Sequence, residues 1–118
     1  MKRILVVDDE PDINLALKIV LEDKGFRVDT FEDPLLALDN FRQEFYDLLI
    51  VDIKMQKLNG LELFGKIRSI DNKAKVCFLT AGEMYHSGDT AIFEGKNQFI
   101  RKPIENEELL RKVNEIMI

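Results

Sequence analysis

The chain has 118 residues, a length that suits one domain built around one hydrophobic core, residues 1–118. Apolar residues make up 46% of the sequence and charged residues 33%, a balance that excludes an intrinsically disordered chain. The net charge of −5 argues against general attraction to nucleic acid, so we expect no direct nucleic-acid binding by this chain.

Targeting signals and disulfides are also not expected. The longest apolar runs fall short of the roughly 20 residues that a membrane-spanning helix needs, and the N-terminal sequence turns acidic at Asp8, too early for a signal peptide. We therefore expect a cytoplasmic protein without membrane insertion. The one cysteine, Cys77, lies in an apolar run and is expected to be a buried, unreactive side chain.

Short apolar runs alternate with helical periodicity along the chain. The runs predict five strands, over residues 4–7, 27–31, 48–51, 76–79 and 99–101. The first four helices are expected to begin at Pro11, begin at Pro34, follow Gly60, and occupy part of residues 82–95; the last begins at about Asn106. Five strands alternating with five helices predict an α/β fold, a doubly wound, flavodoxin-like parallel sheet in the order 2-1-3-4-5 with helices on both faces.

The spacing of apolar residues predicts which side of each helix faces the core. In the first helix the predicted buried residues are Ile13, Ala16, Leu17, Val20 and Leu21. In the second and third they are Ala37, Leu38, Phe41, Leu63, Phe64, Ile67 and Ile70, and in the last Leu109, Leu110, Val113 and Ile116. Leu15 and Ile19 instead point outward, which suggests either a docking site for a partner helix or ordinary surface residues.

Polar residues follow four of the predicted strands at the point where each strand ends. Asp8 and Asp9 follow the first strand, Asp52 the third, Thr80 the fourth and Lys102 the fifth. In the predicted order these four strands are neighbours, so their carboxyl ends meet at one crevice. Each residue alone has an ordinary explanation as a turn former or surface group, but their convergence favours a functional site.

The charges of this group indicate a divalent cation and a phosphoryl group. Three carboxylates repel one another, and Mg²⁺, with its preference for oxygen ligands, relieves that repulsion. The cation and Lys102 together balance the three aspartates. We expect Asp52 to act as a nucleophile that accepts a phosphoryl group, whose added negative charge the cation, Lys102 and the Thr80 hydroxyl would stabilise.

Four motifs carry a family resemblance: VVDDEPDI, VDIKMQKLNG, LTAG and FIRKPI. In this order and spacing they resemble the receiver domain of two-component response regulators, including the chemotaxis receiver, over Lys2 to about Ile116. The resemblance implies that Asp52 is the phosphoacceptor, that Asp9 binds Mg²⁺ directly, and that Asp8 binds it largely through water. It also implies that the backbone carbonyl of Lys54 completes the metal ligands, with Mn²⁺ as an alternative cation.

The same resemblance assigns the remaining site residues. Thr80 corresponds to the switch hydroxyl that moves toward the phosphoryl group, and Phe99 to the switch aromatic that turns inward with it. Lys102 corresponds to the family's lysine, with a cis peptide bond to Pro103. Lys54 and Gly82 occupy positions that tune the lifetime of the phosphoryl group. Gln56 replaces the usual proline and Lys96 a usual small residue, which together suggest a less rigid loop and an unusual output face.

The resemblance predicts a phosphorylation-activated signalling switch. The phosphodonor would be a sensor histidine kinase or a histidine phosphotransfer protein, and the output surface would comprise the helix within residues 82–95, the strand 99–101 and the last helix. Such a protein is not a conventional enzyme but catalyses its own Mg²⁺-dependent phosphorylation and dephosphorylation. Two alternatives are a degenerate receiver that only binds partner proteins and a phosphatase with an aspartyl-phosphate intermediate.

Overall fold

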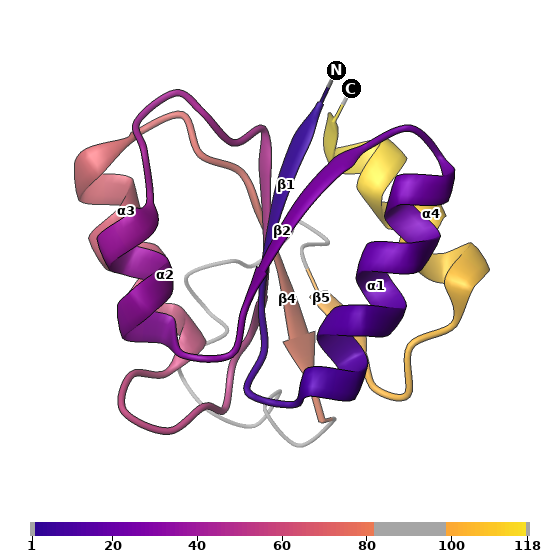
Figure 1. Cartoon of the computed structure of the whole chain (residues 1–118), viewed down its shortest axis with the longest axis horizontal. Helices are drawn as coiled ribbons and strands as arrows, with labels where there is room; N and C mark the ends of the chain where they lie inside the picture. Colours follow the sequence, from indigo (N-terminus) through magenta and orange to yellow (C-terminus); the bar gives the residue numbers. More distant parts are fainter. Residues whose placement is uncertain (1, 82–98, 118) are drawn as a thin grey trace.

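The computed structural model describes residues 2–81 and 99–117, in which strands and helices follow the predicted alternation (Figure 1). The strands are β1 (Arg3–Val7), β2 (Arg27–Phe31), β3 (Leu48–Asp52), β4 (Val76–Thr80) and β5 (Phe99–Arg101). The helices are α1 (Pro11–Asp23), α2 (Pro34–Asn40), α3 (Gly60–Ile70) and α4 (Asn106–Met117). The helix expected within residues 82–95 lies outside the described residues. None of the helices that the structure describes is long and apolar enough to cross a membrane.

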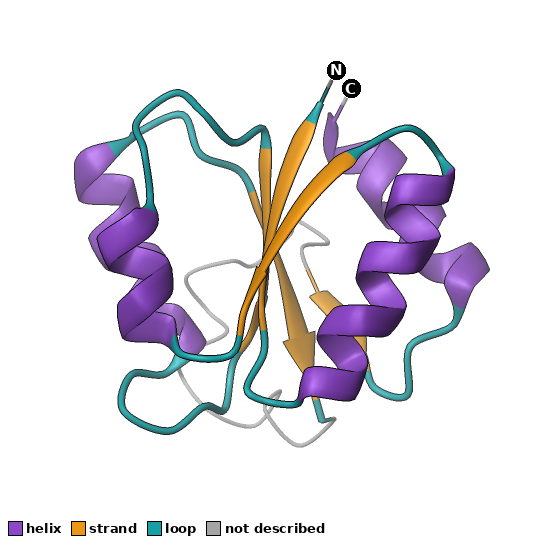
Figure 2. Ribbon diagram, in the orientation of Figure 1, coloured by secondary structure: helices purple, strands orange, loops and turns teal. Residues whose placement is uncertain are grey.

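All strand pairs are parallel, and the sheet has the predicted order β2-β1-β3-β4-β5. Helices α2 and α3 cover one face of the sheet, and α1 and α4 cover the other (Figure 2). The sheet is buried on both faces, as its continuous apolar strands require, and every residue of β3 and β4 is buried. Each face has its own hydrophobic core, one around Phe78 and Leu63 and the other around Leu21 and Leu109.

The buried side of α1 differs from the prediction at one position. Leu17 and Leu21 are buried as expected, but Ala16 is exposed and Asn14 is buried instead. The Asn14 amide can be buried because it donates to two backbone carbonyls, those of Asp8 at 2.8 Å and Phe31 at 3.2 Å. The helix is therefore rotated so that Ala16 lies beyond the edge of the buried stripe.

The other helices follow the predicted pattern more closely. Leu63, Phe64 and Ile67 of α3 are buried, but Ile70 is 42% exposed because it is the last residue of the helix, and Asp71 is buried in its place. The Asp71 carboxylate accepts backbone hydrogen bonds from Glu44 and Lys73, which accounts for its burial.

In α4, Leu109 and Val113 are buried, whereas Leu110 and Ile116 are half-buried at the edges of the stripe. Phe41 is buried just beyond the end of α2, and Ala37 and Leu38 face the core as predicted.

The start of α3 lies against the end of β3, and Gly60 makes this close approach possible. Asn59 caps the helix by accepting from the Glu62 backbone N–H at 2.8 Å, and the Glu62 side chain accepts from the Asn59 N–H in return. The Gly60 N–H donates to the Ile53 carbonyl at 2.7 Å. A Cβ at Gly60 would overlap the Asp52 carbonyl oxygen and lie 3.0 Å from the Ile53 Cα. Only glycine fits this position, against the backbone of Asp52.

We predict that Gly60→Ala destabilises the protein by roughly 2–4 kcal/mol, because backbone atoms of β3 must move to accept the new methyl group. Gly65→Ala in the same helix is the matched control. An added Cβ there meets no atom within 4 Å, and helix propensity favours alanine by roughly 0.5–1 kcal/mol. Urea unfolding of the two variants measures both effects. Equal stabilities would contradict the close approach of α3 to β3.

Candidate functional site

The polar residues singled out from the sequence lie together at the carboxyl end of the sheet. Asp8 follows β1, Asp52 ends β3, Thr80 ends β4 and Lys102 follows β5. Backbone hydrogen bonds continue beyond the strand ends, from the Lys102 N–H to the Thr80 carbonyl at 2.8 Å and from the Ile53 N–H to the Leu79 carbonyl at 3.0 Å. Asp8, Asp52 and Thr80 are all buried. The register of the parallel strands therefore brings these residues together at one end of the sheet, as predicted.

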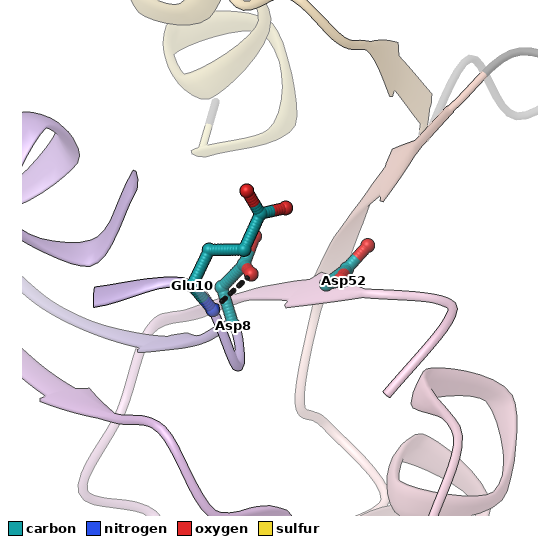
Figure 3. Close-up of side chains that lie close together, drawn as sticks. All are labelled: Asp8, Glu10 and Asp52. Atoms are coloured by element: carbon teal, nitrogen blue, oxygen red, sulfur yellow. Dashed lines mark hydrogen bonds between the residues drawn. The ribbon is translucent and has the colours of Figure 1, made fainter. Parts of the chain in front are cut away.

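The Lys102 ammonium lies among three carboxylates. Its Nζ is 3.0 Å from Glu10 Oε1, 3.1 Å from Asp8 Oδ2 and 3.5 Å from Asp52 Oδ1. Figure 3 shows Asp8 and Glu10 side by side, with Asp52 across from them on β3. Carboxylate oxygens of Asp8, Glu10 and Asp52 all lie within 4.8 Å of one another, and we call these three residues the acidic cluster.

Two members of the site were not predicted. Glu10 enters the acidic cluster, and its backbone N–H also donates to Asp8 Oδ1 at 2.9 Å. The side-chain amide of Asn14 donates a hydrogen bond to the backbone carbonyl of Asp8 and so holds it in place. The sequence signal for Asn14 was weak, a polar residue at the edge of an apolar stripe. Glu10 gave no signal beyond its place after two aspartates, since an exposed glutamate before a helix is common.

Burial and like charges perturb the acids of the site. Burial raises the pKa of Asp52, the Asp8 charge adds to the rise, and Lys102 opposes it, leaving a pKa of about 6. Burial also raises the pKa of Asp8, against the lowering effects of the Glu10 N–H and Lys102. Burial alone would lower the pKa of Lys102, but its interactions with Glu10 and Asp8 outweigh burial and raise it. The lysine therefore stays charged, and it offsets only part of the repulsion among the carboxylates.

The acidic cluster fits a hard divalent cation. Its oxygens are close enough to share one ion, and Asp8 Oδ2 is buried without a well-formed hydrogen bond, although the Lys102 ammonium lies 3.1 Å away. Carboxylate oxygens are the ligands that Mg²⁺ accepts. Asp9 is exposed and outside the acidic cluster, yet close enough for its charge to raise the pKa of Asp52. Its direct ligation of a metal stays a prediction.

The remaining predicted residues surround this centre. Phe99 is half-buried, and its ring lies 5.8 Å, centroid to centroid, from that of Phe78. Lys54 is exposed, two residues beyond Asp52. The Lys102–Pro103 peptide bond is cis, which confirms the expectation from the resemblance. Gly82 lies outside the described residues, so its role stays a prediction.

We predict that Asp52→Asn stabilises the metal-free protein, and more so at pH 7 than at pH 5. Folding raises the pKa of the Asp52 carboxyl from 3.8 to about 6. The folded protein therefore loses stability as pH rises through this interval, because the folded state holds the proton more tightly than the unfolded state does. The full interval corresponds to roughly 3 kcal/mol, and we expect about 1–3 kcal/mol at pH 7. Urea unfolding without divalent cations measures the difference, and an equal gain at both pH values would contradict it.

Comparisons with known proteins agree with this geometry. A family model described as the response regulator receiver domain matches residues 4–114. The transcriptional regulatory protein DltR of Streptococcus agalactiae is 33% identical over 111 residues, which cover 94% of this chain and 50% of DltR. The chain thus spans about half the length of the curated relatives that it matches.

Two solved structures are also similar. The response regulator TrrA of Thermotoga maritima, in complex with Mg²⁺ and BeF, is 38% identical with a TM-score of 0.82, covering 98% of this chain and 99% of that chain. A chain from the complex of histidine kinase ThkA with TrrA is 39% identical with a TM-score of 0.84, covering 100% of both chains. Since the family model covers nearly the whole sequence, the chain belongs to the receiver domain family of response regulators.

Proposed function

We propose that this chain is a phosphorylation-activated signalling switch in which Asp52 is the phosphoacceptor. The observation that carries the proposal is the position of Asp52, a buried carboxylate 3.5 Å from the Lys102 ammonium and beside Asp8 at the end of the sheet. A carboxylate with no catalytic task would gain stability in solvent, away from other acids. Asp52 is instead buried beside the groups that would stabilise the charge of a phosphoryl group attached to it, as expected of a nucleophile.

The proposed step is a phosphoryl transfer to a carboxylate oxygen of Asp52. A new P–O bond forms as the P–N bond of a phosphohistidine breaks; the bonding electron pair leaves with the imidazole, which takes a proton from solvent. With acetyl phosphate as donor, the P–O bond to the acetyl group breaks and acetate leaves. Lys102 stabilises the charge on the transferred phosphoryl oxygens, and the Thr80 hydroxyl donates a hydrogen bond to them.

Asp8, Asp9, Asp52 and the Lys54 backbone carbonyl would hold Mg²⁺ at this site. When bound, the cation supplies positive charge to the phosphoryl oxygens and relieves repulsion among the acids. The oxygen-rich acidic cluster supports this assignment, as does the similarity to TrrA, which was solved with Mg²⁺ and BeF. Lys54 and Gly82 border the same site in sequence, and we infer that they set how long the phosphoryl group persists.

Thr80 and Phe99 would pass the change to a partner surface. Thr80 is buried at the end of β4, and Phe99 begins β5, the next strand. Movement of the Thr80 hydroxyl toward the phosphoryl group would open space for Phe99, whose ring packs on Phe78. We infer that the surface around β5 and α4 then differs between the two states, so that an output protein or domain binds one of them. The helix expected within residues 82–95, which belongs to the same predicted output surface, lies outside the described residues.

We predict that acetyl phosphate and Mg²⁺ add one phosphoryl group to the protein, seen as a mass increase in intact-protein mass spectrometry. Asp52→Asn should abolish the increase, because an amide oxygen does not form a stable acyl phosphate, and chelation of the cation should prevent it. The Glu115→Gln variant, which alters an exposed acid on α4, is the control. An unmodified wild-type protein would sink the proposal, and a modified Asp52→Asn would move the acceptor elsewhere.

Leu15 and Ile19 suggest how a kinase would approach. They are 59% and 60% exposed one turn apart on α1, as the sequence predicted. Ile19 also lines a groove between α1 and α4 together with Val20 and Leu110. The helix α1 begins beside the acidic cluster, so a helical partner lying along it would reach Asp52 with a phosphohistidine. TrrA, which is similar over the whole chain, was solved with its histidine kinase.

We predict that Leu15→Glu with Ile19→Glu slows phosphotransfer from a phosphorylated histidine kinase that acts on the wild type by at least about tenfold. Phosphorylation by acetyl phosphate, which needs no docking, should stay unchanged. Leu36→Glu is the matched control, because Leu36 is 52% exposed on α2, on the opposite side of the sheet. Equal kinase rates for the double variant and the control would remove α1 from the docking surface.

A further inference from the structure

The carboxylate of Glu10 holds the Lys102 ammonium more closely than Asp52 does. The Nζ of Lys102 donates a hydrogen bond to Glu10 Oε1 at 3.0 Å, while Asp52 Oδ1 lies 3.5 Å away. The Glu10 side chain is 60% exposed and the Lys102 side chain only 16%. Glu10 therefore reaches inward from the surface to the lysine that the phosphoryl group on Asp52 would require.

The side chain of Glu10 has no other evident structural task among the described residues. It begins α1 as the N-cap, but its side chain makes no capping hydrogen bond. The helix start relies on the Glu10 carbonyl, which accepts from the Ile13 and Asn14 N–H groups, and Asp8 is held by the Glu10 backbone N–H. These backbone contacts would survive replacement of the carboxylate by an amide of the same shape.

The Glu10 carboxylate changes the net charge of the site around Asp52. Among the described residues, Asp8, Glu10 and Asp52 surround the Lys102 ammonium, and Asp9 lies near enough for its charge to act on Asp52. These four acids and one lysine carry an excess of three negative charges, which a divalent cation would reduce to one. Phosphorylation of Asp52 adds roughly one more negative charge. Without the charge of Glu10, the cation-bound site would begin neutral, and Lys102 would be released to the phosphoryl oxygens.

We propose that Glu10 is a positioning residue that competes with the phosphoryl group on Asp52 for the Lys102 ammonium, and so limits the phosphorylated fraction of the protein. The proposal rests on phosphorylation of Asp52. Glu10 and Asp8 hold the Lys102 ammonium in the unphosphorylated state, and a phosphoryl group on Asp52 would draw it away from Glu10. Because Glu10 is more than half exposed, solvent screens its charge and the effect is graded rather than all-or-none.

The test compares Glu10→Gln with Glu32→Gln at saturating Mg²⁺. Gln keeps the size of the side chain and removes its charge, and Glu32 is an exposed acid on the neighbouring loop after β2, where it lines a pocket with Asp9. At a limiting acetyl phosphate concentration, Glu10→Gln should raise the phosphorylated fraction about two- to fivefold, and Glu32→Gln should change it by less than about 1.5-fold. Equal effects of the two variants would show a general charge effect and overturn the proposal.

Side-chain NMR of Lys102 supplies a readout that does not depend on phosphorylation. In the metal-free protein, Glu10→Gln should shift the Lys102 Nζ and Cε resonances and speed hydrogen exchange of the ammonium, whereas Glu32→Gln should not. After phosphorylation, the resonances of the wild type and Glu10→Gln should converge, because the phosphoryl group has replaced Glu10 in both. Lys102 resonances that do not change in Glu10→Gln would refute the competition between Glu10 and the phosphoryl group, and would leave the proposed function standing. A wild type that acetyl phosphate cannot phosphorylate would remove the proposed function and this inference together.

Discussion

The ammonium of Lys102 lies within 3.5 Å of three carboxylates at one end of the sheet, and the arrangement of the whole domain serves to keep it there. Parallel pairing places the ends of β1, β3 and β5 at the same edge, and two fully buried strands hold Asp52 and Thr80 at fixed heights. Gly60 lets α3 pack directly beneath Asp52, and Asn14 ties α1 to the backbone of Asp8. Rigid packing on both faces thus maintains an electrostatically unfavourable cluster.

That cluster costs stability, because burial and neighbouring acids disfavour the charged form of Asp52. Burial that raises the pKa of Asp52 to about 6 disfavours the charged form, which a cation and a lysine can restore. A site of this kind gains the most stability when a cation binds. Its charge balance would change the most when a phosphoryl group is added. In the proposed switch, the same carboxylates that weaken the metal-free protein would make the site responsive to metal and to phosphorylation.

The sequence predicted the parts of this arrangement that depend on chain topology. The residues at the strand ends converged as expected because a parallel order of buried strands leaves one place for Asp8, Asp52, Thr80 and Lys102. Prediction failed where individual side chains decide the outcome. Ala16 is exposed because the amide of Asn14 finds two carbonyl partners and takes the buried edge of α1. Glu10 was missed because its partner Lys102 is far away in sequence, and no local pattern reveals such a contact.

Borohydride trapping of the phosphorylated protein tests whether Asp52 is the phosphoacceptor, since it identifies the residue that carries the phosphoryl group. Borohydride reduces an aspartyl phosphate to homoserine, which peptide sequencing by mass spectrometry locates. After treatment with acetyl phosphate and Mg²⁺, we expect homoserine at position 52 and at no other aspartate. Homoserine at position 8 or 9, with Asp52 unmodified, would contradict it.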